Sequence, residues 1–314
     1  MAETSAKGAV RTVDVAADRD GQRLDNFLLG LLKGAPRSLI YRIVRSGEVR
    51  INGKRAKPDS RLAGGDRVRI PPVRLGEPDA GEGPPSGMAE RLAEHIVFED
   101  RALLVLNKPC GIAAHGGSGV RFGAIELLRR ARPNDSLELV HRLDRDTSGV
   151  LVLAKKRSAL LELQRQMREG GIRKRYLALL VGRMAESFTV DVALQKSVLS
   201  GGERMVRVNA EGKESVSHFQ LIERRGGHSY AEVRIETGRT HQIRVHAAHL
   251  GHPVAGDEKY GDREANRRLR DQVGLKRMFL HAASLEFALD EGRSPYVLSA
   301  PLAPELAAAL DRLA

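Results

Sequence analysis

The 314-residue chain is poor in cysteine and in aromatic side chains. It has one Cys, no Trp, 5 Tyr and 7 Phe. A single cysteine excludes an internal disulfide and a cysteine-rich zinc site, and such usage is typical of a reducing compartment. The scarcity of aromatic residues argues against a protein that binds single strands by stacking successive bases on aromatic side chains.

Long apolar runs are also missing. No stretch approaches the roughly 18 residues that a membrane span needs, and residues 1–8 lack the apolar core of a secretory signal. Hydrophobic residues make up 41% and charged residues 29% of the chain, which is ordinary for globular domains and excludes wholesale disorder. We therefore expect a soluble cytoplasmic protein without a membrane partner.

Positive charge is in excess and is unevenly distributed. The formal net charge is +12, and residues 33–69 alone carry eleven basic residues against three acidic ones, a local excess of +8. Excess charge of this kind predicts a polyanionic partner, usually nucleic acid. The simpler alternative is a protein that is merely soluble and basic.

Residues 21–70 show the pattern of a compact module with two short helices followed by short strands. Apolar residues recur at helical spacing from Leu24 to Leu32, and Ser38 can cap a second helix that ends at Gly47. An Asn-Gly pair at 52–53 predicts a tight turn between strands. This arrangement resembles the S4 RNA-binding domain. The resemblance implies that basic side chains of the module contact RNA: Arg23, Arg37, Arg42, Arg45, Arg50, Lys54 and Arg55.

The rest of the chain divides into a tail, a linker and one large domain. We expect residues 1–20 to form a flexible tail. Residues 71–90 are expected to be a linker, because five of the 13 prolines fall there among glycines. In residues 91–314, strand-like apolar runs alternate with amphipathic helices, and many strands follow one another directly. The expected fold class is α+β: an S4-like module, a linker, and a mixed domain with a largely antiparallel sheet.

A dense polar stretch, His-Arg-Leu-Asp-Arg-Asp-Thr-Ser-Gly at 141–149, directly precedes an apolar strand. Polar residues in this position lie on a loop that a rigid element holds in place, as in many active sites. Arg142 and Arg145 flank Asp144 and Asp146, and neighbouring guanidinium groups keep a carboxylate ionised. An ionised carboxylate can act as a nucleophile or stabilise a cationic sugar. A salt-bridged structural turn is the alternative interpretation.

A second dense stretch runs from residue 236 to 261 and contains four closely spaced histidines. These are His241, His246, His249 and His252. Their spacing of five, three and three fits no usual metal motif, and no cysteine supports one. We therefore expect no metal site, and the stretch is better interpreted as polar residues beside an RNA surface.

Together, the two stretches resemble the signature motifs of the RluA family of RNA pseudouridine synthases. Supporting runs are Asn-Lys-Pro-Cys-Gly at 107–111, His-Gly-Gly at 115–117 and Lys-Arg-Tyr-Leu-Ala at 174–178. The runs at 195–196, 202–208 and 260–264 are similar to the family members that carry an S4 domain and modify 23S rRNA. The resemblance covers about residues 20–312. It implies an isomerase that converts specific 23S rRNA uridines to pseudouridine without a cofactor or a metal.

The resemblance also implies roles for individual residues. Asp144 matches the catalytic aspartate, which attacks the ribose of a flipped-out uridine or assists departure of the base, and the sequence leaves both routes open. Tyr176 matches the tyrosine that stacks on the base and is placed to take the C5 proton. Arg244 matches the basic partner of the aspartate, with Arg239 as the alternative. Further residues are implied to contact the target nucleotide: Arg142, which enters the RNA in its place, Ile243, which packs the base, Arg239 and His241.

Two other functions compete with this interpretation. A non-catalytic S4-type ribosome-binding protein would explain the basic module, but it leaves Asp144 and Arg244 without a purpose. A glycoside hydrolase needs two carboxylates about 5–10 Å apart that flank a sugar; Asp144 and Asp146 are the candidate pair, and this function ranks last of the three. We expect a monomer whose partner is 23S rRNA or an assembly intermediate. Cys110 is expected to pack, and the basic segment 262–276 is either an rRNA contact or a solvated helix face.

Overall fold

The computed structural model of the chain forms two separate units. It describes residues 10–32, 35, 37–73, 87–117, 120–198, 204–289 and 295–313. The first unit is Met1–Gly83 and the second is Pro84–Ala314. No helix in the described ranges combines the length and the apolar character that crossing a membrane requires.

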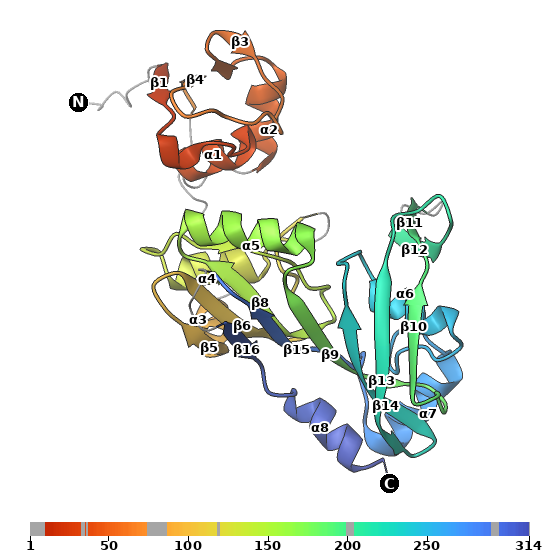
Figure 1. Ribbon diagram of the computed structural model, residues 1–314. Coiled ribbons are helices and arrows are strands. Elements are labelled where there is room, and N and C mark those ends of the chain that lie inside the picture. The colour runs from red at the N-terminus through yellow and green to blue at the C-terminus, as the bar shows by residue number, and fades with distance from the viewer. Residues whose placement is uncertain are drawn as a thin grey trace, which may run out of the picture. The chain divides into compact units, whose positions relative to one another are not determined.

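The N-terminal unit is a small antiparallel sheet covered by two helices (Figure 1). Its elements are β1 (Arg11–Asp14), α1 (Leu24–Leu31), α2 (Arg37–Arg45), β2 (Arg50–Ile51), β3 (Lys54–Arg55) and β4 (Arg67–Ile70). The sheet order is β1-β4-β2-β3. The turn between β2 and β3 has positive φ angles at Asn52 (51°) and Gly53 (78°), as the Asn-Gly pair predicts for a hairpin turn of this length.

The prediction of a tail over residues 1–20 is wrong for the part that the structure describes. Arg11–Asp14 pair with β4 in the register Arg11↔Ile70, and Val15 is 2% exposed within the core of the unit. A four-residue strand at a sheet edge offers too few apolar–polar alternations to be detected from sequence. Residues 1–9 lie outside the described residues, as do residues 74–86 of the predicted linker, and Met88–Ala93 already form helix α3.

The C-terminal unit is built on one long sheet. Its strands are β5 (Ile96–Glu99), β6 (Leu103–Lys108), β7 (Glu138–Leu139), β8 (Ser148–Ala154), β9 (Arg173–Leu180), β10 (Ser187–Asp191), β13 (Val216–Arg225), β14 (His228–Ile235), β15 (Leu280–Phe287) and β16 (Tyr296–Ser299). The order along the sheet is β10-β13-β14-β9-β15-β8-β6-β5, with β16 beside β15 and β7 beside β8. Every pair within the described strands is antiparallel except β15 with β8. The largely antiparallel sheet is therefore confirmed.

Helices cover both faces of the β5–β8 half of the sheet. Helices α3 and α4 (Ala124–Ala131) pack against one face, where Leu104 and Leu151 contribute to the core. Helix α5 (Arg157–Glu169) packs against the other face, with Val105 and Val152. Because both faces are covered, all seven residues of β8 are buried. This is why β8 is apolar along its whole length rather than alternating.

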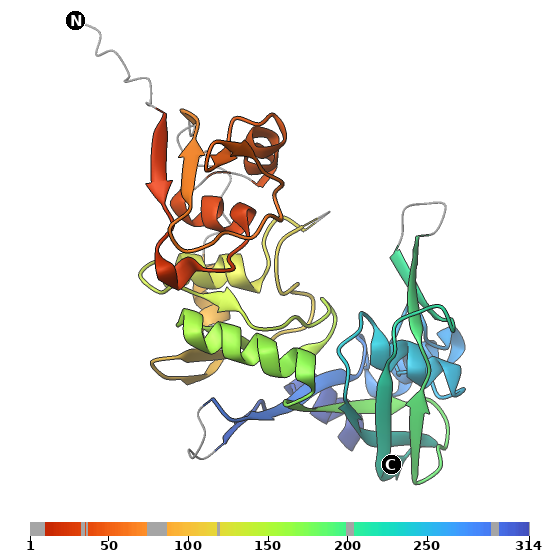
Figure 2. The same cartoon turned by 45° about the horizontal axis from the view of Figure 1, so that its top comes forward.

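The β9–β14 half has its own helices. Helix α6 (Gln242–His249) packs on one core, and α7 (Arg263–Val273) with α8 (Pro304–Asp311) packs on another. A two-stranded hairpin, β11 (Leu194–Val198) with β12 (Arg204–Val208), is joined to α6 by contact between Val206 and Val245. Figure 2 shows this hairpin standing out from the body of the unit. Strands β8, β15 and β9 lie side by side where the two halves meet, so residues at their ends come together.

The parallel contact between β8 and β15 depends on Gly149. Its φ is +109°, and a Cβ placed there would lie 2.1 Å from the carbonyl oxygen of Ala282. We expect Gly149→Ala to lower the free energy of unfolding by about 2–3 kcal/mol, because it combines a strained backbone with a backbone clash. Denaturant unfolding measures the loss. Gly171→Ala is the matched control, because its Cβ meets nothing closer than 3.5 Å; equal stability of the two variants would contradict the argument.

Candidate active site

The loop that carries Asp144 connects β7 to β8, and a buried lysine donates a hydrogen bond to its backbone. Lys108, at the end of β6, is 0% exposed. Its ammonium group donates hydrogen bonds to the carbonyl oxygens of Pro109 (2.8 Å), Ile112 (2.7 Å) and Arg145 (3.1 Å). Burial lowers the pKa of Lys108 to about 8. The group therefore remains largely protonated at neutral pH, where all three of its N–H donors are used.

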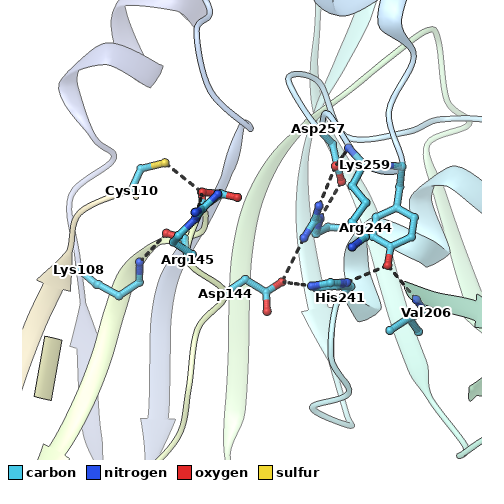
Figure 3. Close-up of polar contacts among 11 residues, drawn as sticks. Lys108, Cys110, Asp144, Arg145, Val206, His241, Arg244, Asp257 and Lys259 are labelled. Atoms are coloured by element: carbon cyan, nitrogen blue, oxygen red, sulfur yellow. Dashed lines mark hydrogen bonds and ion pairs between the residues drawn. The ribbon is translucent and has the colours of Figure 1, made fainter. Parts of the chain in front are cut away.

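Neighbouring atoms of the same segment fix the loop further. The Cys110 Sγ donates to the carbonyl oxygen of Asp146 (3.3 Å), and the Gly111 N–H donates to that of Arg145 (2.9 Å). Figure 3 shows Lys108 and Cys110 on one side of Asp144, with Arg244 and His241 on the other. The thiol thus contacts the backbone of the loop, and the segment 108–111 orients the Asp144 loop.

Arg244 connects Asp144 to a second, buried carboxylate. It lies in α6 and is 7% exposed, and its Nε and Nη2 donate to Asp257 Oδ2 (2.7 Å) and Oδ1 (2.8 Å). Its Nη1 lies 3.6 Å from Asp144 Oδ2. Burial alone would raise the pKa of Asp257, but the hydrogen bonds and charge of Arg244 hold it below its usual range. A bidentate pair of this kind fixes the guanidinium plane and aims its remaining nitrogen at Asp144.

His241 also approaches Asp144, from the position that immediately precedes α6. Its Nε2 lies 3.9 Å from Asp144 Oδ2, and its Nδ1 lies 2.8 Å from the Tyr260 hydroxyl. That hydroxyl accepts a hydrogen bond from the Val206 N–H (3.0 Å). If the hydroxyl donates its own proton to Nδ1, the ring hydrogen lies on Nε2 and faces Asp144. Burial lowers the pKa of His241, which favours this neutral form.

Asp144 and Tyr176 line one open cavity of about 760 Å³. His115, Arg142 and Arg239 also line it. Tyr176 lies in β9, and burial, together with the charge of Asp144, raises its pKa far above the usual value. The phenol is therefore protonated at neutral pH. The lining holds four arginine and lysine side chains against three carboxylates, with one aromatic face. This combination suits an anionic substrate that carries a planar group.

Of the two arginines predicted to keep Asp144 and Asp146 ionised, neither forms an ion pair with Asp144. Arg142 is exposed, and its Nη1 lies 3.0 Å from His115 Nε2. Arg145 pairs with Asp146 at 3.2 Å. Arg145 and Asp146 lie in a turn in which the Thr147 N–H donates to the carbonyl oxygen of Asp144 (3.2 Å). The guanidinium near Asp144 comes instead from Arg244, far along the chain.

The other residues predicted to contact the target nucleotide differ in how far they are buried. Ile243 is 5% exposed and packs in the core below α6, which Tyr176 also contacts. Arg239 is exposed, and its Nε donates to the carbonyl oxygen of Glu214 (3.1 Å). Gln242 organises the loop before α6, because its Oε1 accepts hydrogen bonds from Thr237 Oγ1 (2.8 Å) and from the backbone N–H of Arg239 (3.0 Å).

Four of these residues were given no individual role by the sequence interpretation: Lys108, Gln242, Asp257 and Tyr260. Two signals were available. A lysine that ends an apolar strand is a candidate for burial. Asp257 and Tyr260 lie in a short loop between two glycines, the kind of loop that often carries functional side chains.

The closely spaced histidines have separate partners. His246 Nδ1 lies 2.9 Å from Ser217 Oγ, and His252 Nδ1 lies 3.0 Å from the carbonyl oxygen of Val181. Within the described ranges, no three His, Cys, Asp or Glu side chains are grouped so that they could hold a metal ion.

His141, in the same loop as Asp144, predicts acid-sensitive stability. Its Nε2 accepts a hydrogen bond from the Val152 N–H (3.1 Å), and burial together with the Lys174 charge lowers its pKa to about 4. Between pH 6.5 and 4 the unfolded state therefore binds a proton that the folded state does not, so this group's contribution to stability is lost as pH falls. We expect up to about 1.4 kcal/mol per pH unit. The stability difference between the wild type and His141→Gln, measured by denaturant unfolding, should shrink over this interval; a constant difference would contradict this.

The N-terminal unit presents basic side chains on its surface. Arg23 is held by the buried Asp25, through Nε–Oδ1 (3.1 Å) and Nη2–Oδ2 (2.7 Å). The side chain of Arg37 lies outside what the structure describes. The remaining basic residues predicted to contact RNA are exposed and have no carboxylate within ion-pair distance among the described residues: Arg42, Arg45, Arg50, Lys54 and Arg55.

Comparison with known proteins places this site in a family. Residues 102–249, which include the Asp144 loop, β9 and α6, match the model of the RNA pseudouridylate synthase family, and residues 22–68 match the S4 domain. The ribosomal large subunit pseudouridine synthases C of Salmonella typhi and Escherichia coli are 51% and 50% identical to the chain, over 97% of each protein. The chain belongs to the RNA pseudouridylate synthase family.

Solved structures of this family have the same fold in the catalytic unit. Human RNA pseudouridylate synthase domain containing 1 is 30% identical, with a TM-score of 0.57, over 68% of this chain and 86% of that one. Human RNA pseudouridylate synthase domain containing 4 is 25% identical, with a TM-score of 0.59, over 72% of this chain and 95% of that one. The predicted S4 module and mixed catalytic domain are confirmed, and so is the enzyme class: the protein is a pseudouridine synthase, an isomerase.

Proposed function

We propose that this pseudouridine synthase isomerises uridines of large-subunit (23S) rRNA, with Asp144 as the residue that acts on the ribose. The observation that supports the role of Asp144 is its position in the cavity, beside Tyr176 and within 4 Å of both Arg244 and His241. The relatives that match over nearly their whole length are named for the large ribosomal subunit, which supports this class of RNA.

The reaction exchanges one glycosidic bond for another. A uridine leaves the stack and enters the cavity, which is least costly where the RNA is already looped, and Arg142 is proposed to take its place. The Asp144 carboxylate either adds to C1′ or assists elimination as the C1′–N1 electron pair departs with the base. The base turns, C5 bonds to C1′, N1 gains a proton and the C5 proton is lost.

The remaining proposed roles follow from charge and position. Arg244 keeps Asp144 oriented, and His241 presents a neutral N–H to the same carboxylate. Because the Tyr176 phenol is protonated at neutral pH, it can accept the C5 proton only as it passes its own proton on. We place Ile243 behind the base, where it packs beneath Tyr176.

The S4 unit is proposed to anchor the rRNA. Its exposed arginines and lysine suit contacts with phosphates, which supply affinity without reading sequence. We further propose that the enzyme works as a monomer in the cytoplasm, where large-subunit rRNA or its assembly intermediate is the substrate.

Pseudouridine mapping of rRNA from cells that lack the protein tests the proposed function. We expect one or more 23S positions to remain uridine, and a plasmid copy of the wild-type chain to restore them. A copy with Asp144→Asn should restore none. An unchanged pseudouridine map would instead favour a non-catalytic ribosome-binding protein.

A further inference from the structure

The cavity contains a buried cation that the proposed chemistry does not use. Lys174 lies in β9, is 6% exposed and lines the same cavity as Asp144 and Tyr176. Its ammonium group makes one hydrogen bond to the described residues, to the carbonyl oxygen of Glu236 at 3.2 Å. An ammonium group has three N–H donors, so two of them have no partner among the described residues.

A second cation lies close to the first. Arg239 lines the cavity, and its charge is near enough to lower the pKa of Lys174 further, after burial. The Arg239 guanidinium contacts the Glu214 carbonyl oxygen and, within the described residues, no carboxylate. Two like charges therefore act on each other across the cavity, one of them buried, and neither forms an ion pair with a carboxylate among the described residues. Such an arrangement is costly unless an anion joins it.

We propose that Lys174 and Arg239 form a phosphate-binding subsite, which holds a phosphodiester next to the flipped uridine. This inference rests on the proposed function, because the anion is a phosphodiester of the RNA substrate. A phosphodiester offers two charged oxygens, one for each cation, whereas the carbonyl oxygens of uracil carry no net charge. Lys174 and Tyr176 are two residues apart on one strand, so both point to the same face, about 7 Å apart along it. Base and phosphate of one nucleotide can then contact Tyr176 and Lys174 together.

The alternative is that Lys174 only stabilises the loop that begins at Glu236. A purely structural lysine and a phosphate ligand respond differently when the charge of the RNA is changed. The test therefore combines a protein variant with an RNA that carries a neutral methylphosphonate linkage on the 5′ or the 3′ side of the target uridine.

Binding is measured in the Asp144→Asn background with a short stem-loop that contains a mapped target uridine. We expect one of the two methylphosphonates to weaken binding about tenfold to a hundredfold, the usual range for a hydrogen bond to a charged group. Lys174→Met should weaken binding of the natural RNA by a similar factor, and that methylphosphonate should then cost the variant less than it costs the wild type, because only Arg239 still contacts the linkage. If the two losses multiply, or if neither linkage affects binding, the subsite does not exist.

Three controls keep the outcome clear. Lys174→Arg retains the charge and should recover most of the affinity. Lys156→Met, which removes the exposed lysine immediately before α5, should leave the affinity for the RNA unchanged. If Lys174→Met does not fold, Arg239→Gln supplies the same comparison from an exposed position. Turnover of the natural stem-loop by the wild type is scored separately: its absence would contradict the proposed function, while the binding comparison still decides the subsite.

Discussion

Asp144→Asn is expected to leave the protein folded and bound to RNA while abolishing pseudouridine formation. The asparagine amide has nearly the shape of the carboxylate, so the contacts of the loop with Lys108 and Cys110 persist. It has no negative charge with which to attack C1′ or to stabilise a cationic sugar. Turnover should fall by a factor on the order of 10⁴ or more, as for removal of other catalytic nucleophiles. Release of tritium from RNA labelled at uridine C5 measures turnover, and filter binding measures affinity.

Asp146→Asn is the matched control for this prediction. Asp146 lies two residues further along the same loop, and its carboxylate is paired with the exposed Arg145. Turnover should stay within about twofold of the wild type, because surface ion pairs contribute little. Tritium release by Asp144→Asn near the wild-type rate would overturn the proposed role of Asp144.

Arg244→Met is expected to reduce both stability and turnover. Removing the guanidinium leaves Asp257, which is 2% exposed, as a buried carboxylate without its counter-ion. Breaking one side of such a pair costs about 3–5 kcal/mol. Asp144 loses its cation in the same variant. Denaturant unfolding and tritium release measure the two effects separately.

A second substitution separates the structural role of Arg244 from its role at Asp144. In Arg244→Met with Asp257→Asn, no buried charge is left unpaired, so much of the lost stability should return. Turnover should remain low, because Asp144 still lacks its partner. Recovery of turnover along with stability would show that Arg244 acts only through folding. Arg268→Met, which removes an exposed arginine paired with Glu264, should change neither quantity.

Much of the fold was predictable because it depends on local patterns. The helix over Arg157–Glu169 follows from apolar residues at helical spacing and from Gly170, which ends it with a positive φ of 79°. Strand β8 was detectable from its continuous apolar run. Strand β1 was missed, because four residues at an edge carry little pattern and owe their place to pairing with β4, more than 50 residues later in the chain.

The candidate site was only partly predictable, for a related reason. The sequence and the family resemblance pointed to Asp144, Tyr176 and Arg244 as individual residues. The distances among them depend on the order of strands in the sheet, which no local pattern determines. The same holds for Asp257, whose partnership with Arg244 joins a loop to a helix. Of the arginines assigned to Asp144 and Asp146 because they are neighbours in sequence, only Arg145 forms such a pair, and its partner is Asp146.

The parallel contact between β8 and β15 sets the spacing on which the chemistry depends. Only two residue pairs define it, Ser148↔His281 and Gly149↔Ala282. Asp144 lies just before β8. Its cation, Arg244, is in α6, which packs on the other half of the sheet, across β15 from β8. A slip of one residue here would move the carboxylate by about 3.3 Å, comparable to the whole Asp144–Arg244 distance of 3.6 Å. The register of these two strands therefore sets the distance between Asp144 and Arg244. A molecule in which they pair one residue out of register would keep the S4 unit and the RNA contacts proposed for it, but it would not catalyse the reaction.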